Sequence, residues 1–226
     1  MSAALFTILY FFEIMACVIG LVYRKRLGDT VFKWFPVYLV FVVFSETLGR
    51  YVLQGSLRLE RLNQEYFNYF EIPTEFIFFF WLFYKSESFK FKSLPLICSG
   101  LYLLGWITDI IYFSKHEYSF YSFSYTLGNL LLLVVILRYF VSLVTSNHIL
   151  SFWHDMLFWI GTGQLIYYLG TFPFYGLRNT LCDHYQSLYA TYTIIMCILN
   201  SSMYLMFSLS FIWGRPNTGH LSSSQH

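Results

Sequence analysis

Charged residues are scarce in this sequence. Of its 226 residues, only 12% are Asp, Glu, Lys or Arg, whereas 57% are hydrophobic and 23% are aromatic. Soluble domains average about 25% charged residues, so a chain of this size would lack the polar surface that water requires. The scarcity of charge excludes a soluble globular protein and indicates that a lipid bilayer surrounds most of the chain.

The sequence also lacks a concentration of basic charge. The formal net charge is only +2, and the Lys and Arg residues are scattered between apolar stretches. Nucleic-acid binding requires a basic patch gathered on one side of a domain. We therefore expect no nucleic-acid partner.

Motifs that carry catalysis or hold a cofactor are absent as well. The sequence has no GxSxG, CxxC or HExxH motif and no phosphate-binding loop, so we expect neither an enzyme nor a metal site. None of its long apolar stretches contains a lysine, which excludes a retinal Schiff base. Three of the 4 cysteines, Cys17, Cys98 and Cys197, fall in apolar stretches, and Cys182 has no partner in a nearby loop. No intramolecular disulfide is predicted.

What the sequence does have is a series of long apolar stretches. A membrane-spanning helix needs about 20 mostly apolar residues, and seven stretches of that kind are separated by short polar or charged segments. They cover residues 3–23, 34–54, 66–84, 94–113, 122–144, 152–174 and 187–213. The sequence predicts an all-α fold in which residues 1–213 form a bundle of seven transmembrane helices. Residues 214–226 have no apolar face and predict a disordered cytoplasmic tail.

The distribution of Lys and Arg predicts the orientation of this bundle. Nine of the 14 basic residues lie on the side of the first and third connecting segments. Cytoplasmic loops carry an excess of Lys and Arg, so we expect the N-terminus outside and the C-terminus in the cytoplasm. The basic cluster at 24–26 follows the first apolar run, an order typical of a first spanning helix and not of a signal peptide.

Ionisable and amide side chains interrupt the apolar stretches. They are Glu13, Glu46, Arg50, Glu71, Glu75, Asp109, Asn129, Gln164 and Asn200. A charge at the bilayer centre costs about 2.5–3.5 kcal/mol, so we expect these side chains to face the inside of the bundle. A spacing of four residues puts Glu46 beside Arg50 as a favourable pair and Glu71 beside Glu75 as a pair of like charges. One arginine cannot neutralise five carboxyls.

Three outcomes are open for the carboxyls that Arg50 does not neutralise. They become protonated, they meet water in an outward-open cavity, or they hold a cation, a proton or an amine-bearing ligand. The first two outcomes describe a purely structural role. Pro73, between Glu71 and Glu75, either loosens the helix and frees backbone carbonyls or forms a tolerated kink.

Several short motifs carry a resemblance to a known family. They are Phe152-Trp153, the segment 163–168, Asn200 with Tyr204, and the segment 69–71 with Glu75. In these motifs, and in length and number of spans over nearly the whole chain, the sequence resembles a family of uncharacterised seven-helix proteins of Bacteroidota. Genes of that family sometimes lie beside sensor histidine kinase genes. The resemblance implies a receptor or signalling subunit in a bacterial inner membrane, and it implies no catalytic residues.

The sequence therefore predicts an integral membrane protein that is receptor-like or a sensor subunit. Its ligand pocket would be acidic, would lie within the membrane and would face outward. Because all connecting segments are short, we expect a partner protein to carry the signal. A proton- or cation-coupled transporter using the same acids is one alternative, and a structural or assembly subunit is the other.

Overall fold

The computed structural model describes residues 3–53, 56–113, 122–145 and 152–216. Within these ranges, helices are the only regular structure apart from one isolated β-bridge between Asp155 and Arg215. The prediction of an all-α fold is confirmed. The tail beyond residue 216 lies outside the described residues.

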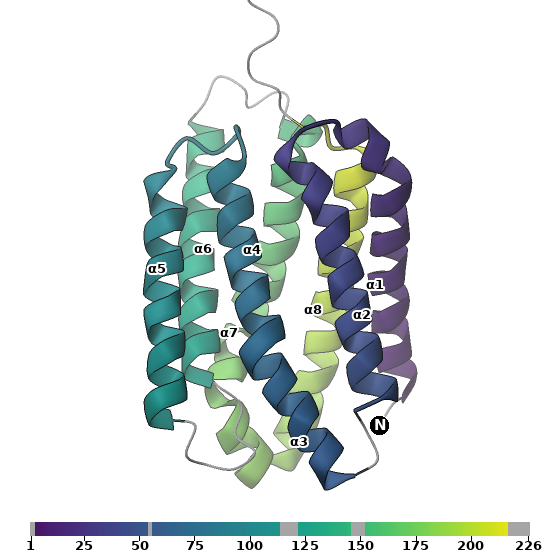
Figure 1. The fold of residues 1–226 in the computed structure, drawn as a ribbon, viewed down its shortest axis with the longest axis vertical. Helices are drawn as coiled ribbons and strands as arrows, with labels where there is room; N and C mark the ends of the chain where they lie inside the picture. Colours follow the sequence, from purple (N-terminus) through teal and green to yellow (C-terminus); the bar gives the residue numbers. More distant parts are fainter. Residues whose placement is uncertain (1–2, 54–55, 114–121, 146–151, 217–226) are drawn as a thin grey trace, which may run out of the picture.

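The helices run up and down as a bundle (Figure 1). The α-helices are α1 (Ala3–Tyr23), α2 (Phe35–Tyr51), α3 (Leu57–Tyr66), α4 (Ile72–Lys85), α5 (Ser93–Thr108), α6 (Ser122–Val144), α7 (Met156–His184) and α8 (Gln186–Ile212). The π-helical turn η3 (Phe67–Glu71) joins α3 to α4, and η4 (Asp109–Phe113) extends α5. The shorter 3₁₀ turns are η1 (Arg24–Leu27), η2 (Val31–Trp34) and η5 (Phe152–His154). Since α3, η3 and α4 form one continuous rod, the described chain contains seven helical rods.

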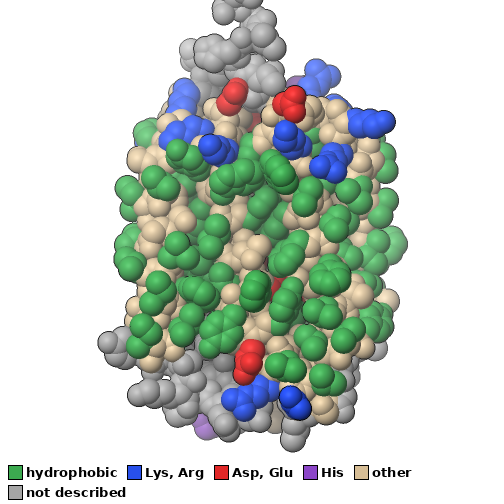
Figure 2. Space-filling view, viewed as in Figure 1, with side chains coloured by type: hydrophobic (Ala, Val, Ile, Leu, Met, Phe, Trp, Pro, Cys, Tyr) green, Lys and Arg blue, Asp and Glu red, His purple; other side chains and the backbone are tan. Residues whose placement is uncertain are grey.

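Within the described ranges, five helical segments are long and apolar enough to cross a membrane. They are Leu5–Leu27, Val31–Tyr51, Ser93–Ile111, Phe123–Val144 and Gln186–Ile212. Hydrophobic side chains cover the middle of the face drawn in Figure 2, while Lys, Arg, Asp and Glu gather toward its two ends. This pattern is that of a multi-pass membrane protein whose outer surface contacts lipid. The α3–α4 rod and α7, which match the third and sixth predicted spans, are not among the five.

The structure differs from the sequence prediction at two helix ends. The charged segment predicted to be a loop before residue 66 is the helix α3, where the Ser56 side chain accepts a hydrogen bond from the Leu59 backbone N–H at 3.3 Å. Helix α7 includes Pro173 and continues beyond the predicted end at residue 174 to His184. In both places the sequence becomes polar, but the helix continues, because its backbone hydrogen bonds do not depend on apolar side chains.

Contacts between distant segments gather much of the basic charge at one end of the bundle. Arg26 Nη1 donates to the carbonyl of Ile212 at 2.9 Å, and the Arg138 guanidinium lies 3.8 Å from the centre of the Phe91 ring. We call this end, with Lys33 and Lys85, the lysine-rich end. Arg50 lies near the opposite end of α2. Charge at the two ends and an apolar middle are what a bundle that crosses a bilayer requires.

Aromatic rings and close helix contacts fill the interior. The buried Phe35 ring lies 5.0 Å from Phe207 and 5.3 Å from Phe211, which ties the start of α2 to α8. A side chain at Gly163 would bring its Cβ to 3.1 Å from the backbone oxygen of Met203, so this glycine lets α7 approach α8 closely. A space inside this packing lies toward the end of the bundle where Arg50 is found.

Candidate functional site

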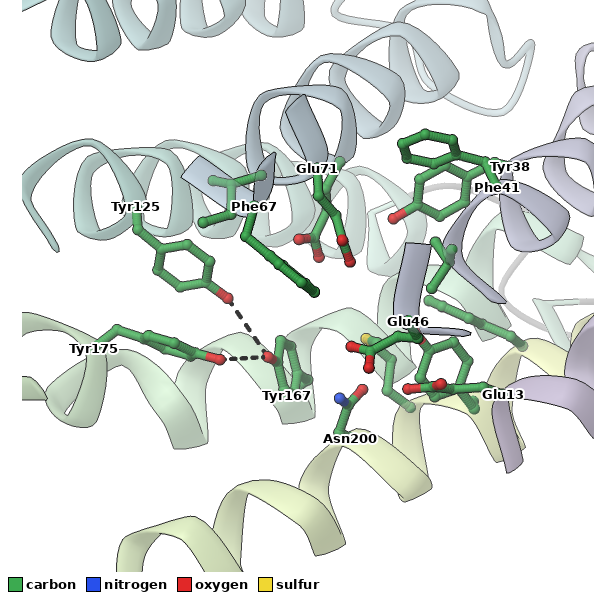
Figure 3. A pocket seen from close by; sticks show the side chains of 16 residues that line it. Glu13, Tyr38, Phe41, Glu46, Phe67, Glu71, Tyr125, Tyr167, Tyr175 and Asn200 are labelled. Atoms are coloured by element: carbon green, nitrogen blue, oxygen red, sulfur yellow. Dashed lines mark hydrogen bonds between the residues drawn. The ribbon is translucent and has the colours of Figure 1, made fainter. Parts of the chain in front are cut away.

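A cavity of about 160 Å³ lies inside the bundle, and four carboxyl side chains line it. Glu13 comes from α1, Glu46 from α2, Glu71 from η3 and Glu75 from α4. Asn200 of α8 and the rings of Tyr38, Phe41, Phe67, Tyr125, Tyr167, Tyr175, Tyr204 and Phe207 complete most of the wall. Figure 3 shows Glu13, Glu46 and Asn200 on one side of this space, Glu71 on another, and Tyr125, Tyr167 and Tyr175 together on a third. We call it the acidic cavity.

Glu13 is the most deeply buried of these acids. It lies midway along α1, a helix that is otherwise apolar, and is only 1% exposed. Its Oε2 atom has no hydrogen-bond partner in the part of the chain that the structure describes. Because lipid cannot satisfy a carboxylate, α1 turns this side chain inward.

Arg50 neutralises Glu46 from the edge of the acidic cavity. Its Nε lies 3.2 Å from Glu46 Oε2, one helical turn away. The guanidinium also donates from Nη1 to the carbonyl of Phe6 at 3.1 Å and lies 5.2 Å from the centre of the Tyr10 ring. These contacts with α1 hold Arg50 at the rim of the cavity, and its side chain is not part of the cavity lining.

Glu71 and Glu75 face the cavity from the α3–α4 rod. Glu75 Oε1 accepts a hydrogen bond from the Tyr168 hydroxyl at 2.5 Å, whereas Glu71 Oε2 has no partner among the described residues. Glu71 ends the π turn η3, two residues before Pro73. Proline has no N–H and its ring clashes with the carbonyl four residues earlier, so the helix is irregular here.

Three tyrosine hydroxyls meet at one side of the acidic cavity. The Tyr167 hydroxyl lies 3.1 Å from that of Tyr175 and 3.5 Å from that of Tyr125, as the dashed lines in Figure 3 show. The sequence alone did not indicate these residues as part of a site. A spacing of eight puts Tyr167 and Tyr175 on one face of α7, but tyrosine is common throughout this chain, with 20 in all.

The other polar residues that the sequence singled out lie elsewhere. The Asp109 carboxylate accepts a hydrogen bond from the Ser124 backbone N–H at 2.8 Å, near the start of α6. Asn129 donates to the carbonyl of Tyr168 at 3.4 Å. Gln164 is fully buried, and its amide has no partner within the described ranges. None of the three lines the acidic cavity.

The chemistry of the cavity suits a cation that is larger than a bare metal ion. Over the described residues, no three His, Cys, Asp or Glu side chains converge closely enough to hold a metal. The lining combines carboxyls with aromatic faces, and no lysine or arginine is part of it. Carboxylates attract positive charge and ring faces attract cations, so an amine can satisfy both kinds of group.

Comparison of the chain with family models, curated proteins and solved structures found no match. The resemblance to the Bacteroidota family therefore stays a prediction, and the case for function rests on the geometry described above.

Proposed function

We propose that this multi-pass membrane protein binds a small amine-bearing cation in the acidic cavity and acts as a receptor-like or sensor subunit. One observation carries the proposal. Four carboxyls from three consecutive parts of the chain converge on one space inside the bundle, and the nearest arginine, Arg50, forms its ion pair with Glu46. Such an excess of ionised acid inside a bundle is costly unless the carboxyls are protonated, meet water or contact a cation, and the proposal assigns them a cation.

The proposal includes seven membrane spans, with the N-terminus outside and the C-terminus in the cytoplasm. Two rods that fall short of a spanning composition, α3–α4 and α7, supply Glu71, Glu75 and Tyr167 to the cavity. A polar rod is tolerated in a membrane when its polar side chains face the bundle interior. In this orientation the lysine-rich end is cytoplasmic and the cavity lies in the outer half. The resemblance to the Bacteroidota family supports a bacterial inner membrane.

A ligand in this cavity would act on the bundle by shifting populations. Glu13 and Glu46 belong to α1 and α2, which Arg50 ties together, whereas Glu71 and Glu75 belong to the α3–α4 rod. A cation that contacts acids of both groups favours the packing in which they are close. In this proposal a partner protein reads the change at the cytoplasmic end.

Ligand binding to the purified protein tests the proposal. In detergent or nanodiscs, thermal stabilisation is measured with tetramethylammonium, ethanolamine and putrescine, and with sodium as the reference ion. At least one amine is expected to bind, and Glu71→Gln is expected to weaken it by about 10-fold to 100-fold, since a charged contact is worth about 1.5–3 kcal/mol. Glu60→Gln is the matched control, because Glu60 is exposed on α3 and lies outside the cavity. Equal binding by both variants, or no binding of any amine, would contradict the proposal.

A transporter is the second candidate, and the irregular helices beside the cavity favour it. Glu71 ends the π turn η3 two residues before Pro73, and Pro173 removes one backbone hydrogen bond of α7 beside Tyr175. Helices with irregular backbone at membrane depth are typical of transporters. Flux of labelled amine or protons into proteoliposomes, abolished by Glu75→Gln, would favour this candidate over a receptor. A structural subunit would instead show changed stability in Glu46→Gln and Glu71→Gln with no amine or pH response.

A further inference from the structure

Two adjoining cavities lie on the outer surface of the bundle, away from the acidic cavity's acids. The first, of about 510 Å³, lies at the lysine-rich end and has both Lys33 and Lys85 in its wall. The second, of about 310 Å³, is apolar and lies between α2 and α4. Trp34 and Trp81 line both of them. We call the first the headgroup cavity and the second the apolar groove.

Charges of both signs line the headgroup cavity. Lys33 and Lys85 supply two cations, and Asp29 and Glu87 supply two anions. Lys33 Nζ lies 3.1 Å from Asp29 Oδ1, and the Asp29 side chain is fully exposed. A molecule that presents both a phosphate and an ammonium group would match this wall on both counts, whereas a purely anionic molecule would face two carboxylates.

The apolar groove continues from this charged region along α2 and α4. Its wall includes Val37 and Phe41 of α2 and Phe78 of α4, with the two tryptophans at its start. Tyr38 stacks on Phe78, with ring centres 4.3 Å apart and planes inclined by 6°, and this pair bridges the two helices. From Trp34 to Phe41 a helix rises by about 10 Å. The groove therefore extends from the charged end into the hydrophobic belt of the bundle.

The two tryptophans mark the level at which the polar and apolar regions meet. Trp34 is 49% exposed, and Trp side chains favour the boundary between lipid headgroups and acyl chains. The cavity with mixed charge lies on the polar side of this boundary, and the apolar groove lies on the other side. A lipid is built in the same order, with a charged headgroup next to an apolar acyl chain.

We propose that the headgroup cavity and the apolar groove together bind one glycerophospholipid of the surrounding bilayer, with a phosphate-and-ammonium headgroup such as phosphatidylethanolamine. Lys33 and Lys85 bind its phosphate, Asp29 and Glu87 attract its ammonium, and one acyl chain lies in the groove. Tyr38 and Phe41 line both this groove and the acidic cavity. The bound chain therefore contacts the outer side of the wall that encloses the acidic cavity. The lipid site does not depend on what the acidic cavity binds.

Retained lipid identifies the occupant directly. The full-length protein is incorporated into nanodiscs with equal amounts of phosphatidylethanolamine and phosphatidylglycerol of identical acyl chains, then released into detergent. Native mass spectrometry counts the lipids that stay bound. The wild type is expected to retain one phosphatidylethanolamine. Lys33→Ala/Lys85→Ala is expected to lower the affinity for this lipid about 30-fold, from about fivefold for each lysine near the surface.

Two further variants separate this site from general charge and from folding. Lys25→Ala/Lys90→Ala removes two exposed lysines that line neither cavity, and it is expected to keep the lipid. Val37→Trp fills the groove from a partly exposed position and is expected to lose the lipid without a change in the helical circular dichroism signal. Preferential retention of phosphatidylglycerol, equal lipid loss in the two lysine variants, or full retention by Val37→Trp would each overturn the proposal.

Discussion

The polar residues of α1 to α4 and those of α5 to α7 look alike in the sequence but have different surroundings. Glu13 and Glu71 reach one cavity, and each keeps a carboxyl oxygen without a partner among the described residues. Asp109 and the Asn129 amide nitrogen instead bond to backbone groups of neighbouring helices, although Asn129 Oδ1 has no partner among the described residues. A backbone N–H or carbonyl near a helix end or a neighbouring helix satisfies a polar side chain locally. The difference teaches that a bond to a backbone group accounts for Asp109, whereas the lack of a partner does not by itself mark a site, since Gln164 has none among the described residues and lies outside the cavity.

The largest expected effect comes from removing two acids on opposite sides of the acidic cavity. Glu13→Gln and Glu71→Gln alone are each expected to weaken amine binding by about tenfold or more. If one ligand contacts both acids, the double variant is expected to lose binding altogether in a calorimetric titration. Single variants that leave affinity unchanged would break the comparison, because the first group of acids would then be no more functional than the second.

Gln164→Leu tests the polar residues of α5 to α7, which form the second group of the comparison. Its buried amide has no partner in the described structure, and an unpaired buried polar group costs about 1–3 kcal/mol. Replacement by a leucine of similar volume is expected to raise the melting temperature in detergent and to leave amine affinity unchanged. A lower melting temperature would show that the Gln164 amide has a partner, and weaker amine binding would show that Gln164 belongs with the first group.

A smaller effect is expected at Asp109. Asp109→Asn keeps the shape of the side chain but weakens its hydrogen bond to the Ser124 N–H, at a cost of about 1 kcal/mol. The melting temperature is expected to fall by a few degrees at most, with amine affinity unchanged. A change in affinity without a change in stability would contradict the structural role given to this carboxyl.

The sequence predicted the helices well, because apolar length alone determines where a chain can cross lipid. The predicted spans 3–23 and 122–144 coincide with α1 and α6. The prediction failed at α3, since a charged amphipathic segment can be helical outside the apolar belt. Polarity within an apolar stretch was enough to predict five of the residues that line the acidic cavity. They are Glu13, Glu46, Glu71, Glu75 and Asn200.

The sequence could not predict which polar side chains meet at one cavity, because that depends on which helices are neighbours. Glu75 bonds to Tyr168, 93 residues away in the chain, and no local spacing reveals such a pair. The tyrosine group at Tyr167 was missed for a related reason. A tyrosine in an apolar helix serves equally well at a lipid interface, in a core or at a site.

The π turn η3 has a consequence for the register of its rod. A π turn contains one residue more than an α-helical turn, and one residue corresponds to about 100° of rotation around the helix axis. The charged face of α3, with its Arg61–Glu65 pair at 3.2 Å, is therefore rotated against the apolar face of α4. Without the extra residue, a rod that keeps Arg61 toward water would turn Glu75 away from Tyr168. The extra residue of η3 therefore lets the charged side chains of α3 face water while Glu75 of α4 faces the interior of the bundle.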